Sequence, residues 1–376
     1  MEAVSRGETA LRLSAALDPA DVVRLRLWRA AIPLLTARVA AHGTESSRQT
    51  VVVEVELASG AVGWGECVAL AEPTYTEEWI DGAWLFLREQ LVPAVLGGRG
   101  RSLVGHPMAH FAVETALVDA RLREVGVNLA EALGGERLTL ARTQVIAMVG
   151  PGGPERFAAS LDPTAALVKL KVSPGADVEP LAALRRVGVP ALAADANGSY
   201  AGAEPGHLRW LDELGLVYLE QPRAADDLAG HRLLASVVST PLALDESLRQ
   251  AGDVTTAIEL GAAAVLNIKP ARLGSFAASC RALEAAARAG LGAFIGGMYE
   301  LGIGRAAALA VAARSEANLP TDLGPSSAYV AEDLTEPHRC DGAGRMVVPR
   351  GPGLGVEVDR ERLGRCSLAS PLEFRR

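Results

Sequence analysis

Charged side chains recur at the ends of short apolar segments in the second half of the sequence. Three are lysines and three are carboxylates, in the order Lys169, Lys171, Asp195, Glu220, Asp245 and Lys269. Buried strands of a parallel sheet are normally apolar along their whole length, so charge at their ends indicates a function. In a barrel of parallel strands the carboxyl ends meet at one mouth, where catalytic groups lie. We therefore expect these six side chains to share one pocket.

The three carboxylates predict a metal site. Unpaired like charges in one pocket raise one another's pKa and cost free energy. A hard divalent cation removes that cost, and three carboxylates leave coordination positions for substrate and water. A single strand-end carboxylate is more often a helix N-cap or a surface ion pair, but three spaced by 25 and 25 residues are not explained in this way. We predict that Asp195, Glu220 and Asp245 bind Mg²⁺, with Mn²⁺ as an alternative ion.

The lysines predict an acid and a base. Lys171 belongs to the second apolar segment and Lys269 to the sixth, so in a barrel they approach from opposite sides of the mouth. A lysine that is partly desolvated and near a cation has a lowered pKa and can accept a proton. Lys169 lies on the same strand face and would lower the pKa of Lys171 further. The alternative, that the lysines only neutralise the carboxylates, is a costly use of buried charge. The predicted reaction removes a proton next to a substrate carboxylate, and the metal holds the enediolate.

The elements that must position these residues repeat with a steady period. One polar or terminal residue from each of the last seven apolar segments gives successive steps of 26, 25, 25, 24, 27 and 26 residues. A period near 25 fits a strand, a loop, a helix and a loop back, and eight such units close into a TIM-type barrel. The eight segments span residues 143–149, 166–172, 191–197, 216–222, 241–247, 263–270, 292–298 and 318–324.

We divide the chain into four parts. Residues 1–22 form an N-terminal extension. Residues 23–138 form an α+β unit, because strand-like alternating segments precede two amphipathic helical segments. Residues 139–335 form the barrel, and residues 336–376, rich in Gly and Pro, pack back toward the α+β unit.

Composition excludes several other classes of function. The 376 residues carry a net charge of −8 without a Lys/Arg-rich run, which gives no support for binding to nucleic acid or to a membrane surface. Neither a signal peptide nor a membrane span is expected. The four cysteines form no C-x-x-C pair, which favours free thiols in a reducing compartment. We expect a cytoplasmic protein that acts on a small carboxylate substrate.

Jointly these motifs resemble the enolase superfamily over nearly all of residues 23–370. W-G-E-C (Trp64–Cys67) and E-P-T-Y-T-E-E (Glu72–Glu78) resemble its capping domain. The resemblance implies an α/β fold, a modified (β/α)-barrel with an α+β N-terminal capping domain, and supports the metal and lysine roles given above. We also expect a homo-oligomer, either a dimer or an octamer. The barrel motifs that carry the resemblance are K-x-K (Lys169–Lys171), D-A-N (Asp195–Asn197), E-Q-P (Glu220–Pro222), D-E-S (Asp245–Ser247) and N-I-K-P (Asn267–Pro270).

Within the superfamily the likeness is strongest to o-succinylbenzoate synthases and N-succinylamino acid (N-acylamino acid) racemases. G-G-M-Y-E-L-G-I-G-R (Gly296–Arg305) resembles their loop after the seventh strand, and Arg272 resembles an arginine of the racemase-type subfamily. In a racemase the two lysines would act on opposite faces of the substrate. In the synthase Lys171 would remove the proton and help to expel hydroxide, while Lys269 stabilises the enediolate. Nine further residues are expected to contact the substrate or the groups that bind it: Lys169, Asn197, Glu246, Arg272, Gly297, Met298, Glu300, Asp322 and Tyr75.

We expect synthase activity in menaquinone synthesis first, and the racemase activity as the alternative or in the same pocket. A muconate-type cycloisomerase and a non-catalytic barrel are the less favoured alternatives. Five features depart from the family pattern and bear on substrate specificity: Ser275, Tyr299, Leu301, Tyr329 and the segment 324–327.

Other motifs argue against rival functions. Residues 302–307 resemble a G-x-G-x-x-A dinucleotide fingerprint, but the segment that follows is helical and lacks a strand-end acid, so we interpret it as a helix-opening turn whose N–H groups could receive a substrate carboxylate. Absence of G-x-S-x-G excludes an α/β-hydrolase. Asp322-Leu-Gly is not the D-x-D of dipeptide epimerases. None of the histidines ends a barrel strand, which argues against a mandelate-racemase-type base, and we expect surface or capping roles for His42, His106, His110, His207, His231 and His338.

Overall fold

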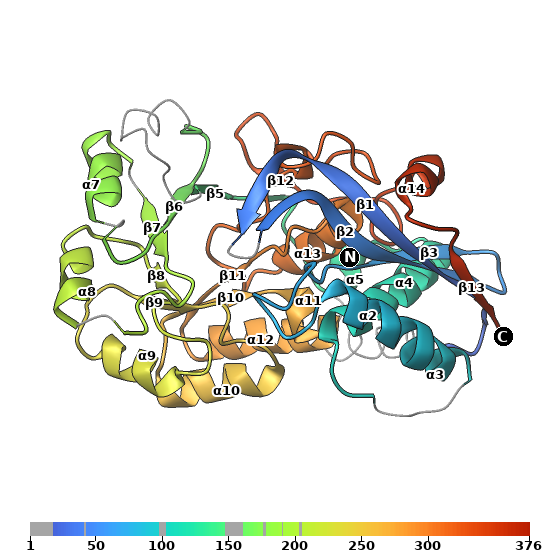
Figure 1. The fold of residues 1–376 in the computed structure, drawn as a ribbon, viewed down its shortest axis with the longest axis horizontal. Coiled ribbons are helices and arrows are strands. Elements are labelled where there is room, and N and C mark those ends of the chain that lie inside the picture. The colour runs from blue at the N-terminus through green and yellow to red at the C-terminus, as the bar shows by residue number, and fades with distance from the viewer. Residues whose placement is uncertain are drawn as a thin grey trace.

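The structure, a computed structural model, has two bodies that lie side by side (Figure 1). One is an antiparallel sheet with its helices, and the other is a parallel sheet surrounded by helices. Among the described helices, none is both long and apolar enough to cross a membrane. The described residues are 18–40, 43–97, 103–146, 161–175, 178–189, 191–202 and 205–376, so most of the predicted extension lies outside them.

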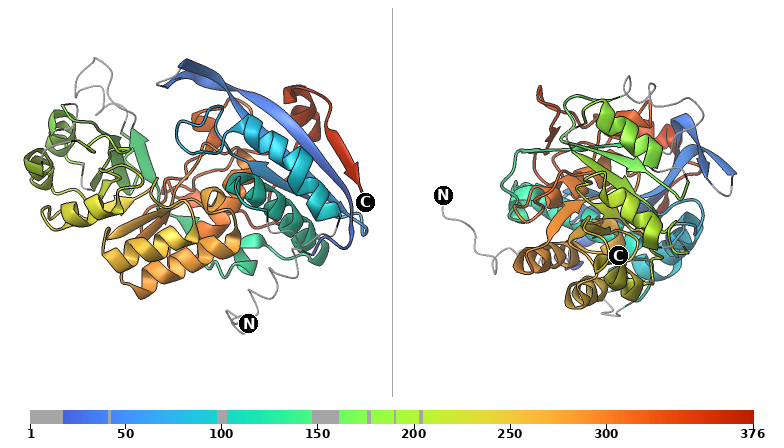
Figure 2. Two further views of the ribbon diagram at one scale, coloured as in Figure 1. Left: turned by 60° about the horizontal axis from the view of Figure 1, so that its bottom comes forward. Right: turned by 90° about the vertical axis from the view of Figure 1, so that its left-hand side faces the viewer.

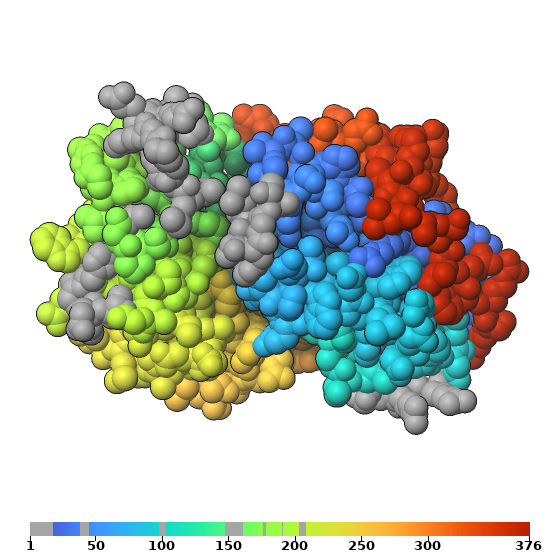
Figure 3. Space-filling view, in the orientation of Figure 1, coloured from blue at the N-terminus to red at the C-terminus, as the bar shows by residue number. Residues whose placement is uncertain are grey.

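The antiparallel sheet has the strand order β13-β1-β2-β3. Alternate residues of β1, such as Leu25 and Leu27, are fully buried, as the period of two along a strand requires. Strand β13 pairs with β1 and so brings the C-terminal segment onto the N-terminal strands, which Figure 3 shows as red atoms against blue. The boundaries that we draw at residues 22, 138 and 335 remain a proposal, which this pairing supports. The strands are β1 (Val22–Ala40), β2 (Gly43–Leu57), β3 (Val62–Cys67) and β13 (Leu372–Arg375).

Helix α4 (Pro107–Val125) packs directly on β3, and two glycines of that strand permit the close approach. A Cβ atom at Gly65 would lie 1.8 Å from the carbonyl oxygen of Ala112, and one at Gly63 would lie 2.2 Å from that of Ala116. The remaining helical segments of this body are α2 (Ile80–Phe86), the π-helical turn η1 (Leu87–Leu91), α3 (Val92–Leu96) and α5 (Leu129–Ala132).

The second body is the predicted α/β barrel. Its parallel strands run in the order β11-β10-β9-β8-β7-β6-β5, and helices cover their outer face (Figure 2, right). The strands are β5 (Thr143–Ile146), β6 (Leu167–Lys171), β7 (Leu192–Asp195), β8 (Leu219–Glu220), β9 (Leu242–Leu244), β10 (Val265–Ile268) and β11 (Gly292–Ile295). The helices are α7 (Val178–Arg186), α8 (Pro205–Asp212), α9 (Leu228–Ala235), α10 (Ala251–Leu260), α11 (Pro270–Leu273), α12 (Phe276–Arg288) and α13 (Gly302–Ala312).

The eighth predicted strand, at 318–324, does not form a regular strand in the described chain. Its backbone nevertheless closes the sheet, because Leu319 N donates to Ala293 O beside β11 and Thr143 N of β5 donates to Thr321 O. Pro320 lies between these contacts and has no N–H to donate, so the ladder cannot continue through it. The prediction of eight regular strands was therefore wrong by one, although the closed arrangement is present. Residues 147–149 of the first predicted strand lie outside the described residues.

Smaller elements complete the chain. Two of them, β4 and β12, form a separate antiparallel pair, and α14 lies between the barrel and β13 in the sequence. They are β4 (Thr139–Leu140), the 3₁₀ turn η2 (Ser326–Ala328), β12 (Met346–Val347) and α14 (Arg360–Cys366).

An apolar layer fills the inside of the barrel below the mouth. Six buried residues, one from each of β6 to β11 or the residue preceding the strand, form one cluster, and Tyr218 and Phe294 stack at 5.5 Å between ring centroids. Two residues further along a strand points to the same face. The period of two therefore carries the next inward positions to the mouth, one layer above the cluster of Leu167, Ala193, Tyr218, Ala243, Val265 and Phe294.

Candidate active site

The layer above this apolar cluster is charged. Lys169, Asp195, Glu220 and Asp245 each follow a member of the cluster by two residues, and Lys171 follows by four. In the sheet, Lys171 pairs with Asp195 and Asp195 pairs with Glu220, so these three stand at one level on neighbouring strands. The structure thus brings together the residues that the sequence places about 25 apart.

Lys169 is fully enclosed by carboxylates. Its Nζ lies 2.6 Å from Glu220 Oε2 and 2.5 Å from Asp322 Oδ2, and only 1% of the residue is exposed. Burial lowers the pKa of Lys169, but the charges of Asp322 and Glu220 together raise it well above its ordinary value. Lys169 is therefore a fixed positive charge, and its role is to hold Glu220 and Asp322.

Glu220 carries more negative charge around it than Lys169 compensates. Burial raises its pKa, to about 8, Lys169 opposes this rise, and Asp195 and Asp245 add to it. Asn267 Nδ2 donates to Glu220 Oε1 at 2.7 Å, so both oxygens have partners.

Lys171 is the lysine that reaches the opening. Its Nζ lies 2.8 Å from Asp195 Oδ2 and also contacts Asn197 Oδ1, and 32% of its side chain is exposed. Burial and Lys169 lower its pKa, but the charge of Asp195 and its hydrogen bond raise it to a net value above the ordinary one. The expected lowering is therefore wrong for the metal-free protein, because Asp195 pairs with Lys171 directly.

Lys269 belongs to a second cluster, centred on Asp245. Lys269 Nζ lies 2.8 Å from Asp245 Oδ2, and Arg272 donates to Asp245 Oδ1 at 2.7 Å. Tyr75, from the N-terminal body, donates to Asp245 Oδ2 at 2.6 Å and accepts from Lys269 at 2.6 Å. Burial acts to raise the pKa of Asp245, but the Lys269 and Arg272 charges hold it well below its usual range.

The loop between β11 and α13 is held by the N-terminal body. Arg48 donates to the carbonyl of Tyr299 at 2.9 Å. The Glu66 carboxylate accepts from Leu301 N at 2.9 Å and from Gly304 N at 2.8 Å, and Asp333 accepts from Gly302 N at 2.9 Å. These N–H groups are occupied, so the expectation that they receive a substrate carboxylate was wrong.

Other predicted site residues take varied places. Glu300 turns back to its own loop, where it accepts from Met298 N and pairs with Arg305 at 3.2 Å. Met298 is buried, and Gly297, beside the Glu300 carboxylate, is half-buried. Glu246 accepts from Asn197 Nδ2 at 2.8 Å at the edge of the mouth.

Among the departures from the family pattern, Ser275 has a local explanation. Its Oγ accepts from Ala278 N at 3.0 Å and so caps the N-terminus of α12, while Gly274, with φ of +80°, makes the turn. Tyr329 donates to the carbonyl of Glu300 and accepts from Arg305, so it braces the same loop.

Two histidines do not have the expected surface or capping roles. His231 is fully buried, and its Nδ1 lies 2.8 Å from Asp227 O. His338 is 6% exposed, and its Nε2 lies 2.8 Å from Gly302 O. Burial lowers the pKa of both, so they serve as neutral struts. His42 and the side chain of His207 lie outside the described residues.

Sequence reasoning missed four residues that support the site: Arg48, Glu66, Gln221 and Asn267. Asn267 gave a signal, since it is a polar residue inside the fully buried strand β10. Glu66 lies in a buried strand in the same way. The contacts of Arg48 and Gln221 depend on other elements and leave no local trace.

The carboxylates of the mouth suit a hard divalent cation. Five carboxylates face four cations there, the donor atoms are all oxygen, and burial raises the pKa of Glu246, to about 7, with Asp245 and Asp195 adding to the rise. Among the described residues, Glu246 Oε2 and Asp322 Oδ1 are buried without a hydrogen-bond partner. In the same residues no three acidic, His or Cys side chains are already grouped around one point, because each predicted ligand pairs with a lysine.

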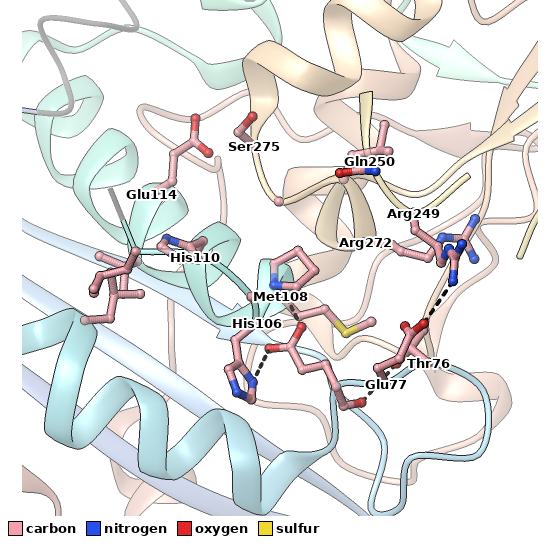
Figure 4. Close-up of a pocket in the computed structure, with 18 of the residues that line it drawn as sticks. Thr76, Glu77, His106, Met108, His110, Glu114, Arg249, Gln250, Arg272 and Ser275 are labelled. Atoms are coloured by element: carbon pink, nitrogen blue, oxygen red, sulfur yellow. Dashed lines mark hydrogen bonds and ion pairs between the residues drawn. The ribbon is translucent and has the colours of Figure 1, made fainter. Parts of the chain in front are cut away.

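A cavity of about 950 Å³ lies away from this mouth, between α4 and the N-terminus of α12 (Figure 4). Only Arg272 among the predicted site residues lines it. The predicted metal ligands and the lysines therefore do not belong to this cavity. Its labelled lining includes His106, His110, Glu114, Arg249 and Ser275.

Comparison with known proteins agrees with this arrangement. Residues 155–362 match the family described as Enolase C-terminal domain-like. An N-succinylamino acid racemase from an Amycolatopsis species is 36% identical over 92% of this chain and 97% of its own length. An o-succinylbenzoate synthase from Geobacillus kaustophilus is 36% identical over 89% and 92%. The solved structure of a probable mandelate racemase from Alicyclobacillus acidocaldarius is 37% identical, covers 94% of this chain and 99% of its own, and superposes with a TM-score of 0.86. The chain belongs to the enolase superfamily.

Proposed function

We propose that this protein is an Mg²⁺-dependent enzyme that removes a proton from the carbon next to a substrate carboxylate. The observation that carries the proposal is the placement of Lys171 and Lys269 at strand ends four positions apart in the sheet, with Asp195, Glu220 and Asp245 on the strands between them. Superfamily members depend in general on a divalent metal.

The three carboxylates would hold the ion, with Mn²⁺ as a substitute. The bound ion supplies positive charge that stabilises the negative charge developing on the substrate carboxylate. Lys169 keeps Glu220 in place, and Arg272 with Tyr75 keeps Asp245 in place.

Lys171 is the proposed base, because it is the lysine of the site with the more exposed side chain. Its Nζ accepts the α-proton after it leaves Asp195, and Asn197 then remains as its partner. Lys269 lies across the mouth. It stabilises the developing charge in a synthase, and it donates or removes the proton on the other face in a racemase.

We favour o-succinylbenzoate synthase activity, a lyase step of menaquinone synthesis. Relatives bearing that name and N-succinylamino acid racemases share 35–36% identity with this chain, so the racemase activity is the second candidate and one pocket can serve both. The buried Arg272 at Asp245 supports the racemase-type subfamily. Substrate contacts from Gly297, Met298, Glu300 and Glu246, assembly as a dimer or octamer, and a cytoplasmic location remain predictions.

The test is turnover by purified protein with Mg²⁺. The substrates are the cyclohexadiene precursor of o-succinylbenzoate and a set of N-succinyl amino acids, and product analysis separates a muconate-type cycloisomerase. Turnover of neither class would sink the proposal and favour the non-catalytic alternative.

Lys171→Ala tests the base. The variant should lose exchange of the α-proton with D₂O by at least about 10²-fold, since a positioned general base contributes that much or more. The measurement is loss of the α-proton signal by NMR, and wild-type exchange in the variant would mean that the base is misassigned.

A further inference from the structure

Gln221, the residue after the proposed ligand Glu220, has an unusual backbone. Its φ is +42°, in the left-handed region that side chains other than glycine rarely adopt, and it is 1% exposed. Such a conformation costs free energy and persists only where its surroundings enforce it, often at functional sites. In a continuing strand Gln221 would point away from the barrel interior. The left-handed turn instead directs its amide toward the loop after β9.

The Gln221 amide uses all of its hydrogen-bonding capacity on its neighbours. Its Oε1 accepts from Asp245 N at 2.9 Å and from Ser247 N at 3.2 Å. Its Nε2 donates to Ser247 Oγ at 2.7 Å and to Arg223 O at 3.1 Å. An amide has two acceptor and two donor positions, so it has none left for a substrate.

The backbone of Gln221 reaches the strand on the other side. Gly198 N, in the loop after β7, donates to Gln221 O at 2.7 Å, and Gln221 N donates to Ala243 O of β9 at 2.8 Å. One residue therefore bonds to the loops that follow Asp195 and Asp245 and is covalently next to Glu220. No other contact described here joins all three proposed ligand loops through one residue.

His231 supports this residue from behind. The ring is fully buried and its Nε2 lies 3.4 Å from Gln221 Nε2 and accepts from Arg223 N at 3.4 Å. The burial of His231 thus has a structural purpose in fixing the turn at Gln221.

We propose that Gln221 is a positioning residue that sets the spacing of the three carboxylates and through it the affinity for Mg²⁺. The inference rests on the proposed function, in which Asp195, Glu220 and Asp245 hold the ion. Mg²⁺ demands near-ideal octahedral geometry, so a small shift of one ligand loop weakens binding. Residues that orient metal ligands typically change metal affinity by about 10- to 100-fold when mutated.

Calorimetric titration of metal-free full-length protein with Mg²⁺ tests the inference. Gln221→Met keeps the side-chain length but removes both acceptor and donor, and its Kd for Mg²⁺ should rise by about 10- to 100-fold. Gln221→Glu restores an acceptor for Asp245 N and Ser247 N and should recover most of this loss. Gln90→Met, the same change at an exposed position of η1, should leave the Kd unchanged.

A kinetic measurement separates positioning from general damage. In Gln221→Met the Mg²⁺ concentration for half-maximal rate should rise with the Kd, while kcat at saturating Mg²⁺ stays within about threefold of wild type, since a positioning role acts through metal occupancy. A fall in kcat that Mg²⁺ does not restore would overturn the inference.

The remaining outcomes also decide. A wild-type Kd in Gln221→Met overturns the inference alone, whereas wild-type protein that binds no Mg²⁺ overturns the proposed function as well. Should Gln221→Met fail to fold, Ser247→Ala removes only the hydroxyl partner of the amide. It should raise the Kd about twofold to tenfold, the effect of one neutral hydrogen bond, and an unchanged Kd would then be the contrary result.

Discussion

Buried charge at the mouth is balanced residue by residue. Lys169 has two carboxylate partners, Lys171 pairs with Asp195, and Lys269 pairs with Asp245. A buried ion pair contributes little net stability, but removal of one partner leaves the other uncompensated. The lysines therefore have a structural share in the fold besides the chemical roles proposed for them.

Lys169→Met should lower the free energy of unfolding by about 3–5 kcal/mol, because Glu220 and Asp322 lose their shared cation. Urea titration in the absence of Mg²⁺ measures the change. Arg365→Met, which breaks an exposed i,i+4 pair with Glu361, is the control and should cost less than about 0.5 kcal/mol. A loss below about 1 kcal/mol for Lys169→Met would contradict the expected cost of an uncompensated buried charge.

Among the elements, α4 carries a carboxylate that has no cation close to it. Glu114 is 9% exposed, and burial raises its pKa from 4.5 to about 8, opposed by a backbone hydrogen bond from Phe276 and by the charge of Arg281. It faces the barrel across the cavity of Figure 4. A folded-state pKa above the unfolded value means that the folded protein binds the proton more tightly.

Glu114→Gln should therefore flatten the pH dependence of stability. The Glu114 contribution is fully present below pH 4.5 and is lost as the pH rises through about 8, a few kcal/mol in all at about 1.4 kcal/mol per unit. The variant, permanently neutral, should match wild type near pH 5 and exceed it at pH 9 in urea unfolding. Parallel curves for the two proteins across this range would show that Glu114 ionises normally.

Elements and their order were predictable from the sequence to an instructive extent. The period near 25 marks strand ends because charge interrupts apolar segments there, and the structure has Lys171, Asp195 and Glu220 as the last residues of β6, β7 and β8. The eighth strand failed at Pro320, whose missing N–H is a local fact that the period ignores. Gln221 escaped detection because its role depends on a left-handed turn that no spacing rule contains.

Across the whole molecule, the apolar cores do not follow the predicted domains. One core joins the N-terminal sheet and α4 to β10, β11 and α10 to α13. A separate core lies under α7 to α9, on the side of the barrel away from the N-terminal body (Figure 1). Cooperative units form where apolar contacts are continuous, so the seam should run through the barrel.

Hydrogen exchange at increasing urea should show this seam. Amides of α7 to α9 should open at lower urea than those of β1, β2 and α13, which share one core. Mass spectrometry of peptic peptides resolves these segments. Opening of the N-terminal body as a unit before any part of the barrel would contradict the expectation.

The lysines have a further consequence for experiments on this protein. Lys169, Lys171 and Lys269 are the only lysines among the 376 residues, since every other basic side chain that could carry a permanent charge is arginine. Of the three, Lys171 has the most exposed side chain. An amine-selective acylating reagent therefore has, apart from the chain's α-amino group, a single accessible target. Its rate of attachment would report the ionisation and access of that one nitrogen without any mutation, tag or substrate.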